Sequence, residues 1–458
     1  MAELSFERTF EALLEEKKYS TIKDVLVTMN PADIAAIFED VDEERLPLLF
    51  RLLPKELAAE TFVEMEPEQQ EILVEGFSDR ELHEVMDELF VDDAVDLVEE
   101  MPANVVKRIL AQADPQMRRE INEILRYPED SAGSIMTTEY VNLHPSMTVG
   151  DAIERIRRTG VDKETIYTCY VTDERKLLGT VTVRELLMAR DDVKVEDLME
   201  TNVISVNTLD DQEMVAQMFN KYNFLALPVV DGENRLVGIV TVDDAIDVME
   251  EEATEDIQKM AAITPTTDKP YDRIGVFETF LSRIPWLLIL MVSATFTGMI
   301  ITGYEDALAA SSAVFLTAFI PMLMDTGGNS GSQASVTVIR ALSLGEIEFK
   351  DIFKVIFKEC RVALLCGVSL AAVNFAKLML FDRLVLHNDH ITFLVAFVVC
   401  LTMVVTIFIA KLVGCTLPMI AKKIGFDPAV MASPFITTIV DAISLVVYFG
   451  IASAILHI

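Results

Sequence analysis

The chain contains the segment Ile391-Thr-Phe-Leu-Val-Ala-Phe-Val-Val-Cys-Leu-Thr-Met-Val-Val-Thr-Ile-Phe-Ile-Ala410, which has no charged side chain over 20 residues. A helix needs about 20 apolar residues to cross the hydrocarbon of a bilayer, so this segment predicts a membrane span. Residues 284–303 form a second uncharged segment of the same length. Three more apolar segments, at 307–324, 362–376 and 428–456, predict an all-α membrane domain of five spans.

The basic residues between these segments indicate how the spans are oriented. The connections at 335–361 and 411–428, with Lys411 counted in the second, are rich in Lys and Arg, whereas 303–306 and 380–390 have one such residue between them. Basic connections stay on the cytoplasmic side, so the N-terminus is predicted inside and the C-terminus outside. The first residues lack a signal-peptide pattern, which agrees with an N-terminus on the cytoplasmic side. We therefore expect a multi-pass protein of the cell (inner) membrane.

Charge divides the 458-residue chain into two parts. The formal net charge is −36 and the mean hydropathy is +0.34, a combination that a uniform chain would not show. Residues 284–458 hold 11 acidic and 10 basic residues, which leaves 63 acidic and 28 basic residues in the first 283. A surface this negative repels nucleic acid and attracts cations, so we expect a cationic partner and no nucleic acid.

Residues 1–130 show helical periodicity in short pieces that are separated by prolines. Pieces of this kind begin at Asp33, Glu56 and Glu81, about 25 residues apart. Such a repeat predicts an acidic N domain built as an α-helical solenoid.

Residues 131–250 change to short β-branched runs that alternate with helices, and the pattern occurs twice. The first copy contains Leu178-Gly-Thr-Val-Thr-Val-Arg-Glu185, and the second contains Val237-Gly-Ile-Val-Thr-Val-Asp-Asp244. A methionine, Met136 or Met199, lies upstream of each copy. These copies resemble a tandem pair of CBS domains, an α+β regulatory module without catalytic activity.

The resemblance to CBS domains implies a nucleotide site between the copies. An adenine nucleotide such as ATP would lie there, with Asp243 and Asp244 near its ribose. An empty, purely structural pair is the alternative. Residues 251–283 then predict helices that connect the pair to the first span, either to transmit movement or as a passive spacer.

One carboxylate lies near the middle of the last expected span. A charged Asp441 facing lipid would cost about 2.5 to 3.5 kcal/mol, so it is expected to face water or a partner. Since no Lys or Arg occurs in the central part of any expected span, a passing cation is the predicted counter-charge. The alternative is a protonated Asp that is hydrogen-bonded inside the bundle.

A second polar group is the run Pro321-Met-Leu-Met-Asp-Thr-Gly-Gly-Asn-Ser-Gly-Ser-Gln333. The proline predicts a helix end or kink, and the three glycines predict irregular backbone around a cavity, although a simple turn is the alternative. Exposed carbonyls, Asn329 and Gln333 would then supply neutral oxygens. Oxygen ligands without His or Cys suit hard cations such as magnesium or calcium.

Taken together, the chain resembles the MgtE family of magnesium channels over nearly its full length. The shared features are the domain order, the run beginning at Pro321 and the last-span sequence Thr437-Thr-Ile-Val-Asp441. The resemblance implies a homodimer whose pore lies on the two-fold axis, where Asp441 of each subunit holds a largely hydrated Mg²⁺ beside Gly328, Asn329 and Thr437. The implied domains are 1–130, 131–250, a connecting (plug) helix at 251–283, and 284–458.

In that family cytosolic magnesium closes the pore by binding acidic surfaces, and the resemblance implies the same here. The matching regulatory positions are Asp92, Asp96, Glu213, Asp244, Asp247, Glu252, Glu255, Asp256 and Asp427. Bare carboxylates repel one another and bridging by divalent ions favours a compact closed state. Asn223 departs from the family pattern, which has an acidic residue there.

We weighed three alternatives to a magnesium channel. The first is a channel for other divalent cations such as cobalt or manganese. The second is an intramembrane aspartyl protease that uses Asp325 and Asp441, although the GxGD signature of such enzymes is missing. The third is a membrane-anchored nucleotide or ion sensor that transports nothing. The absence of a Walker motif argues against an ATP-driven pump, and no enzymatic activity is expected.

Overall fold

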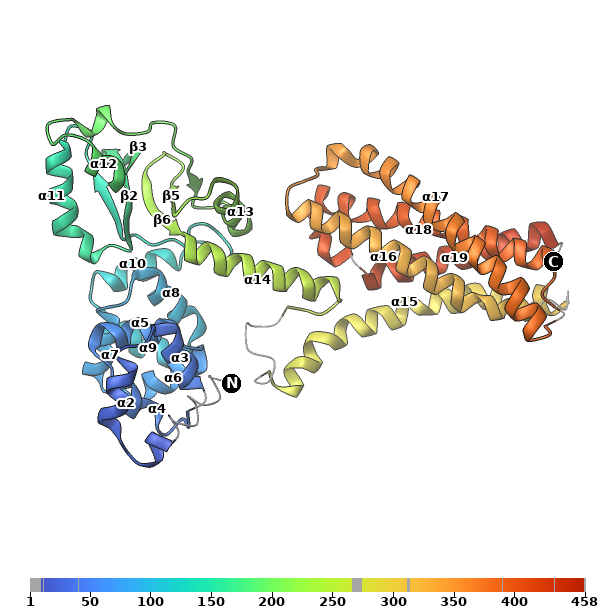
Figure 1. Cartoon of the computed structure of the whole chain (residues 1–458), viewed down its shortest axis with the longest axis horizontal. Coiled ribbons are helices and arrows are strands. Elements are labelled where there is room, and N and C mark those ends of the chain that lie inside the picture. The colour runs from blue at the N-terminus through green and yellow to red at the C-terminus, as the bar shows by residue number, and fades with distance from the viewer. Residues whose placement is uncertain are drawn as a thin grey trace. The chain divides into compact units, whose positions relative to one another are not determined.

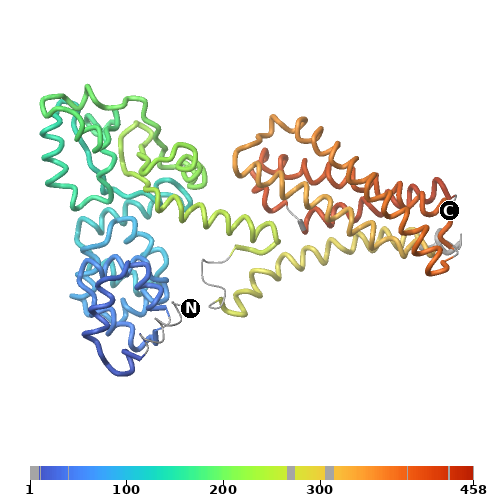
Figure 2. Tube along the Cα trace, viewed as in Figure 1, coloured from blue at the N-terminus to red at the C-terminus, as the bar shows by residue number. Residues whose placement is uncertain are grey.

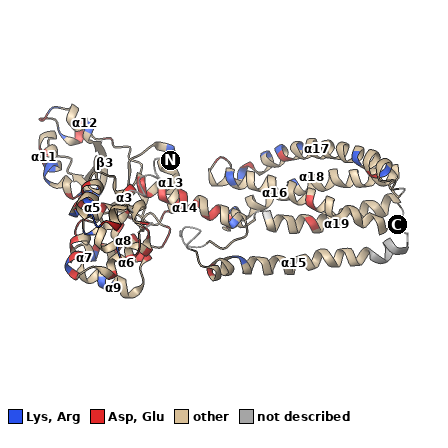
Figure 3. Ribbon diagram, turned by 60° about the horizontal axis from the view of Figure 1, so that its bottom comes forward, with Lys and Arg blue, Asp and Glu red and all other residues tan. Residues whose placement is uncertain are grey.

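The computed structural model describes most of the chain, namely residues 10, 12–39, 41–265, 274–310, 314–388, 390–431 and 433–456. It divides into two compact units, Met1–Met249 and Glu250–Ile458 (Figures 1 and 2). Acidic residues crowd the helices of the first unit, whereas the long helices of the second are mostly uncharged (Figure 3).

The first unit begins with a stack of short helices, as the sequence predicted. They are α2 (Tyr19–Leu26), α3 (Pro31–Glu39), α4 (Leu46–Phe50), α5 (Lys55–Val63), α6 (Pro67–Gly76), α7 (Asp79–Met86), α8 (Val91–Glu100), α9 (Ala103–Gln112) and α10 (Met117–Ile124). Helices this short are marginal alone, so each must bury an apolar face against others. Every second helix makes contact: α3 with α5, α5 with α7, and α7 with α9. The buried core includes Phe38, Phe62 and Leu82.

Two small sheets of identical topology follow, which confirms the predicted α+β pair. The first copy comprises β1 (Tyr140–Leu143), α11 (Val149–Thr159), β2 (Thr165–Asp173), β3 (Lys176–Thr182) and α12 (Val183–Met188). The second comprises β4 (Val206–Asn207), α13 (Gln212–Tyr222), β5 (Ala226–Val230), β6 (Leu236–Thr241) and α14 (Val242–Met260). In each copy the first strand runs parallel to the second, which pairs antiparallel with the third.

The two copies exchange their leading segments. A side chain on Gly179 would meet the sulfur of Met199 at 2.8 Å, and one on Gly238 would meet the sulfur of Met136 at 2.6 Å. The Thr137 amide also donates to the carbonyl of Ile239 at 2.8 Å. Each methionine noted in the sequence thus packs on the sheet of the other copy, which ties the pair together.

Helix α14 is continuous from Val242 to Met260 and crosses the boundary expected after residue 250. The connecting helix is therefore an extension of the last CBS helix. The second helix expected before the first span is the start of α15 (Val276–Ala310). Part of the run that predicted it lies at 266–273, outside the described residues.

The membrane part consists of long helices around α18 (Phe393–Lys423), which contacts α16 (Ile320–Ser343), α17 (Ile352–Lys377) and α19 (Ser433–Leu456). Among the described residues, four helical stretches are long and apolar enough to cross a membrane: Val276–Tyr304, Phe349–Val385, Phe393–Lys423 and Pro428–Leu456. The fifth long helix, α16, is not one of them, since Gly, Ser, Asn and Gln dilute its apolar residues.

The predicted position of the second span, residues 307–324, is wrong. Residues 307–324 do not form one helix: they hold the end of α15, a 3-10 turn at Val314–Phe319 and the start of α16. The turn divides the apolar segment, and the long helix that follows starts only at Ile320.

The irregular backbone predicted around the glycines is also wrong. Pro321 lies in the first turn of α16, where a missing N–H leaves no bond unmade, and the helix continues through the glycines to Ser343. The carbonyls of this run are therefore held within a helix instead of being exposed. The glycines serve close packing, because a side chain on Gly331 would lie 3.2 Å from the carbonyl oxygen of Ala410 on α18.

Candidate cation sites

The predicted pore residues meet where α16 touches α19. A side chain on Gly328 would lie 3.0 Å from the Thr437 methyl and 3.7 Å from Asp441 Oδ1. Gly328 therefore lets the two helices approach beside the carboxylate. Asp441 is half-buried, while the Thr437 hydroxyl donates to the carbonyl of Pro434 at 2.9 Å.

The charged neighbour of Asp441 is another acid. Asp325, four residues before Asn329 on α16, exerts a repulsive interaction on Asp441. The amide nitrogen of Asn329 donates to Asp325 Oδ1 at 3.0 Å, which leaves the Asn329 amide oxygen available as a ligand. In the described part of the membrane unit, no basic side chain pairs with Asp441.

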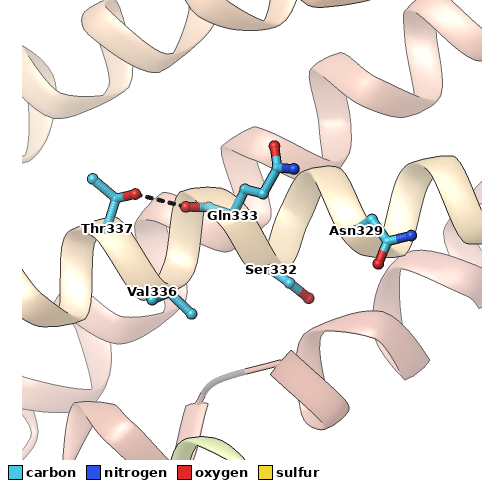
Figure 4. Close-up of a pocket in the computed structure, with 5 residues that line it drawn as sticks. All are labelled: Asn329, Ser332, Gln333, Val336 and Thr337. Atoms are coloured by element: carbon cyan, nitrogen blue, oxygen red, sulfur yellow. Dashed lines mark hydrogen bonds between the residues drawn. The ribbon is translucent and has the colours of Figure 1, made fainter.

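A polar stripe continues along α16 from this point. Figure 4 shows Asn329, Ser332, Gln333, Val336 and Thr337 lining an open hollow of about 590 Å³. Their spacing of three and four residues places them on one helical face. Hydrocarbon cannot satisfy exposed amides, so this face requires water or another protein surface. Ser332 and Thr337 were not predicted as site residues because irregular backbone was expected here, although their helical spacing can be read from the sequence.

A second acidic group lies in the first unit, where α8 meets the beginning of α14. It contains Asp92, Asp93 and Asp96 from α8, Asp244 from α14, and Glu164, which precedes β2. The charged neighbours that act most strongly on these residues are other carboxylates. We call these five residues the α8 cluster.

Burial and mutual repulsion raise the pKa values of the cluster. Burial, followed by the charge of Asp244, raises the pKa of Asp93 to about 7. Burial, followed by the charge of Asp93, raises the pKa of Glu164 to about 8. Asp244 reaches a pKa of about 6, although its hydrogen bond from Thr241 opposes the shift. Burial and the charge of Asp244 also raise the pKa of Asp96, although its side chain is partly in contact with water, which screens the charge.

Two members of the cluster differ in how their oxygens are satisfied. Asp92 is buried and its Oδ1 has no hydrogen-bond partner among the described residues. Asp244 Oδ2 accepts from the Thr241 amide and hydroxyl at 3.2 and 2.6 Å, as a cap of α14. The first CBS copy repeats this cap with Thr182 and Glu185 on the surface. Asp244 therefore has a structural role, and its burial among acids is what distinguishes it.

The carboxylates do not form a ready chelate. Among the described residues, no three His, Cys, Asp or Glu side chains converge as metal ligands. An ion at the α8 cluster would thus be held largely through its water shell, as Mg²⁺ prefers.

The remaining predicted regulatory residues of the first unit lie on helix surfaces. The Glu213 carboxylate in the first turn of α13 accepts from the Gln217 side chain at 3.2 Å. Asp247 is exposed on α14 and its charge acts on Asp244. Asn223 ends α13 in the left-handed conformation, with φ 55°, which Asn tolerates better than most residues. This cap gives a structural reason for its departure from an acidic residue.

The end of α14 carries the other predicted regulatory acids. Glu252, Glu255 and Asp256 lie on its last turns. Asp256 accepts from the Ser343 hydroxyl at 3.1 Å, and Asp427 lies in the connection between α18 and α19. A basic residue, Lys259, contacts Glu255 and Asp427 here.

The position expected for Lys411 is wrong. It lies within α18 instead of a cytoplasmic loop, because this helix extends 13 residues beyond the uncharged segment to Lys423. Lys411 is buried and its Nζ lies 3.8 Å from Glu359 Oε2 on α17. The two charges compensate each other inside the bundle, so neither is a counter-charge for Asp441.

Known family models match the N domain, both CBS copies and most of the membrane part. Residues 29–130 match the MgtE intracellular N domain, residues 132–192 and 195–251 each match the CBS domain, and residues 320–451 match the MgtE model of divalent cation transporters.

Full-length relatives agree with these matches. The chain is 36% identical over 454 residues to a magnesium transporter MgtE of Thermus thermophilus, covering 98% of each chain. It is 34% identical over 450 residues to one of Bacillus subtilis, covering 97% of this chain and 96% of the relative. A crystal structure of the cytosolic domain of the Mg²⁺ channel MgtE in complex with ATP covers 53% of this chain, with 99% of that domain matched, 37% identity and a TM-score of 0.50.

These matches decide between the alternatives drawn from the sequence. The relatives are transporters, so the protease alternative is set aside and the chain is not an enzyme. It is a multi-pass membrane protein whose N-terminal domains are cytosolic, as in its relatives. The chain belongs to the MgtE family of divalent cation transporters.

Proposed function

We propose that this chain is a magnesium-selective channel of the inner membrane that cytosolic magnesium closes. The observation that carries the proposal is Asp441, a carboxylate in a membrane helix whose charged neighbour is Asp325 and not a base. A mobile divalent cation is the counter-charge that such a site lacks. Gly328, Asn329 and Thr437 would line the site with Asp441, through small size and neutral oxygens.

The polar stripe on α16 supports assembly as a homodimer. One copy leaves Asn329 and Gln333 exposed on α16, which we propose to be a membrane span in addition to the four apolar helices. With five spans the C-terminus would lie outside. A second copy related by a two-fold axis would face the stripe with its own, and water would fill the space between them. Two Asp441 carboxylates could then hold Mg²⁺ without removing its water.

The acidic surfaces support control by the same ion. In the α8 cluster, buried Asp92 with its unpartnered oxygen and the repulsion among its neighbours favour an incoming cation. Glu213, Asp247, Glu252, Glu255, Asp256 and Asp427 would contribute further weak sites. We propose that bound Mg²⁺ relieves the repulsion and stabilises the closed arrangement. The relative crystallised with ATP supports a nucleotide at the CBS pair as a second regulator.

The test is divalent-ion flux into proteoliposomes. Asp441→Asn is expected to abolish Mg²⁺ flux while preserving the oligomer measured by gel filtration. The matched control, Asp351→Asn, alters an acid that caps a turn before α17 and should retain parental flux. Comparing Mg²⁺ with Co²⁺ and Mn²⁺ in the parent tests the alternative cargo. Parental Mg²⁺ flux in Asp441→Asn would remove this residue from the pathway.

A further inference from the structure

The end of α14 holds a basic side chain between two carboxylates from different parts of the second unit. Lys259 Nζ lies 2.6 Å from Glu255 Oε1, one turn earlier on α14, and 2.7 Å from Asp427 Oδ2. The Lys259 side chain is 21% exposed, so this contact is largely shielded from water. Shielded ion pairs with direct hydrogen bonds are stronger than exposed ones.

The position of Asp427 is fixed by a backbone hydrogen bond. Its other oxygen, Oδ1, accepts from the Ala429 amide at 2.7 Å, at the start of the 3-10 turn Pro428–Met431. This turn leads directly into α19, the helix that carries Asp441. The contact of Lys259 therefore joins α14 to the connection that begins the proposed pore helix.

Neighbouring contacts show that this end of α14 packs on the helical bundle. Met260 packs with Ile339 of α16 and with Ala429. The hydroxyl of Ser343, at the end of α16, donates to Asp256. Lys259 is thus one part of a docked surface, and it supplies the positive charge there.

The ammonium group of Lys259 offsets the negative charges of the acids around it. A lysine is positively charged at neutral pH, and Lys259 Nζ lies within hydrogen-bond distance of both Glu255 and Asp427. Without the ammonium, Glu255, Asp256 and Asp427 would repel one another.

We propose that Lys259 is a built-in cationic bridge that positions the end of α14 on the membrane bundle without a divalent ion. The inference rests on the proposed magnesium-gated function and specifies its regulation. Lys259 then neutralises Glu255 and Asp427 while magnesium is scarce, and Mg²⁺ that binds this acidic surface adds to the positive charge of the lysine. The bridge favours closure even at low internal magnesium, and bound Mg²⁺ completes it.

The first test measures flux in proteoliposomes of the full chain as a function of internal Mg²⁺. Lys259→Gln should raise flux at micromolar Mg²⁺ and raise the Mg²⁺ concentration for half-closure by about five- to tenfold, at the low end of typical coupling between sites. Lys259→Arg should keep parental closure. The charge swap Lys259→Asp with Asp427→Lys should restore it, which a merely structural role would not do. Lys354→Gln removes an exposed ammonium from α17 as a control and should stay within about twofold of the parent.

The second test examines the contact itself and does not depend on transport. A carbodiimide joins an amine to a carboxylate that touches it. The parent, stripped of metal with EDTA and then transferred to a metal-free buffer without EDTA, should therefore yield a peptide linked between Lys259 and Asp427. Lys259→Arg should yield none. Absence of this link in the parent, or parental closure in Lys259→Gln, would overturn the bridge. Failure of the proposed function would instead abolish magnesium-dependent closure in the parent and leave the cross-link in place.

Discussion

The two acidic surfaces at the ends of α14 differ in the source of their counter-charge. At its beginning, Asp244 belongs to the α8 cluster, where the dominant neighbours are other acids. At its end, Lys259 pairs with Glu255 and Asp427. The first surface therefore needs a cation or a proton from solution, whereas the second carries its own. Acidic residues on one helix can therefore have two roles: those at its beginning can bind an ion from solution, and those at its end can hold the helix in place through a lysine.

The largest effect should follow from removing charge at the first surface. Asp92→Asn with Asp96→Asn and Asp244→Asn deletes the sites where Mg²⁺ relieves repulsion, so half-closure should need at least about tenfold more internal Mg²⁺. Flux in proteoliposomes at several Mg²⁺ concentrations measures this. Neutralising three exposed acids of the N domain, Asp24, Glu43 and Glu68, provides the control. Equal shifts in both triple variants would contradict a specific sensor.

A lysine placed in the α8 cluster should convert it into the second kind of surface. Glu164→Lys puts an ammonium beside Asp93 and Asp244, whose charges act on residue 164. We expect half-closure at about five- to tenfold lower Mg²⁺, because the added ammonium already supplies part of the positive charge that bridges the carboxylates. Glu164→Gln removes repulsion without adding a cation and should shift closure less. If the lysine variant needs more Mg²⁺ than the glutamine variant, the comparison of the two surfaces fails.

The two surfaces should also differ in their response to pH. The pKa values of Asp93 and Glu164, about 7 and about 8, lie above the pKa of about 4 that these side chains have in the unfolded chain. The folded state therefore binds more protons, so its stability is fully present below about pH 4 and is lost as pH rises toward about 8. After correction for intrinsic exchange rates, hydrogen exchange of α8 in EDTA should be several-fold faster at pH 8.5 than at pH 6.

Magnesium and the end of α14 provide the controls for this pH effect. Saturating Mg²⁺ should remove most of the acceleration in α8, because the ion replaces the lost protons. The last turns of α14 should show less acceleration once intrinsic exchange rates are corrected, since Lys259 stays charged over this range. The same pH dependence in both regions would contradict the proposed difference.

The smallest effect is expected at Asn223. Asn223→Asp adds the carboxylate that the family pattern has there, but the left-handed cap already fixes this backbone. Half-closure should shift by less than about twofold, and the free energy of unfolding should change by less than about 1 kcal/mol. Flux and chemical denaturation measure the two quantities. A larger shift in closure would show that this position contributes to sensing despite its distance from the compared surfaces in sequence.

Much of the candidate site could be predicted because its signals are local. The isolation of Asp441 in an apolar run and the acidity of α8 and α14 are readable from neighbouring residues. Glu164 and Asp93 were missed, since their significance depends on burial against segments about 70 to 150 residues away in the chain. Lys259 was missed for the same reason, because its partner Asp427 is far along the sequence.

The order of the residues was enough to predict the division into an acidic part and a membrane part, the duplication of the CBS copies and the family. Hydropathy, charge and repetition are properties of residues in order, so they need no fold to be read. Three features could be seen only in the folded protein: the glycines of α16 pack against α18 and α19, each methionine crosses to the other CBS copy, and Glu255 and Asp427 contact a lysine. These features depend on which distant segments touch, and close packing selects those contacts.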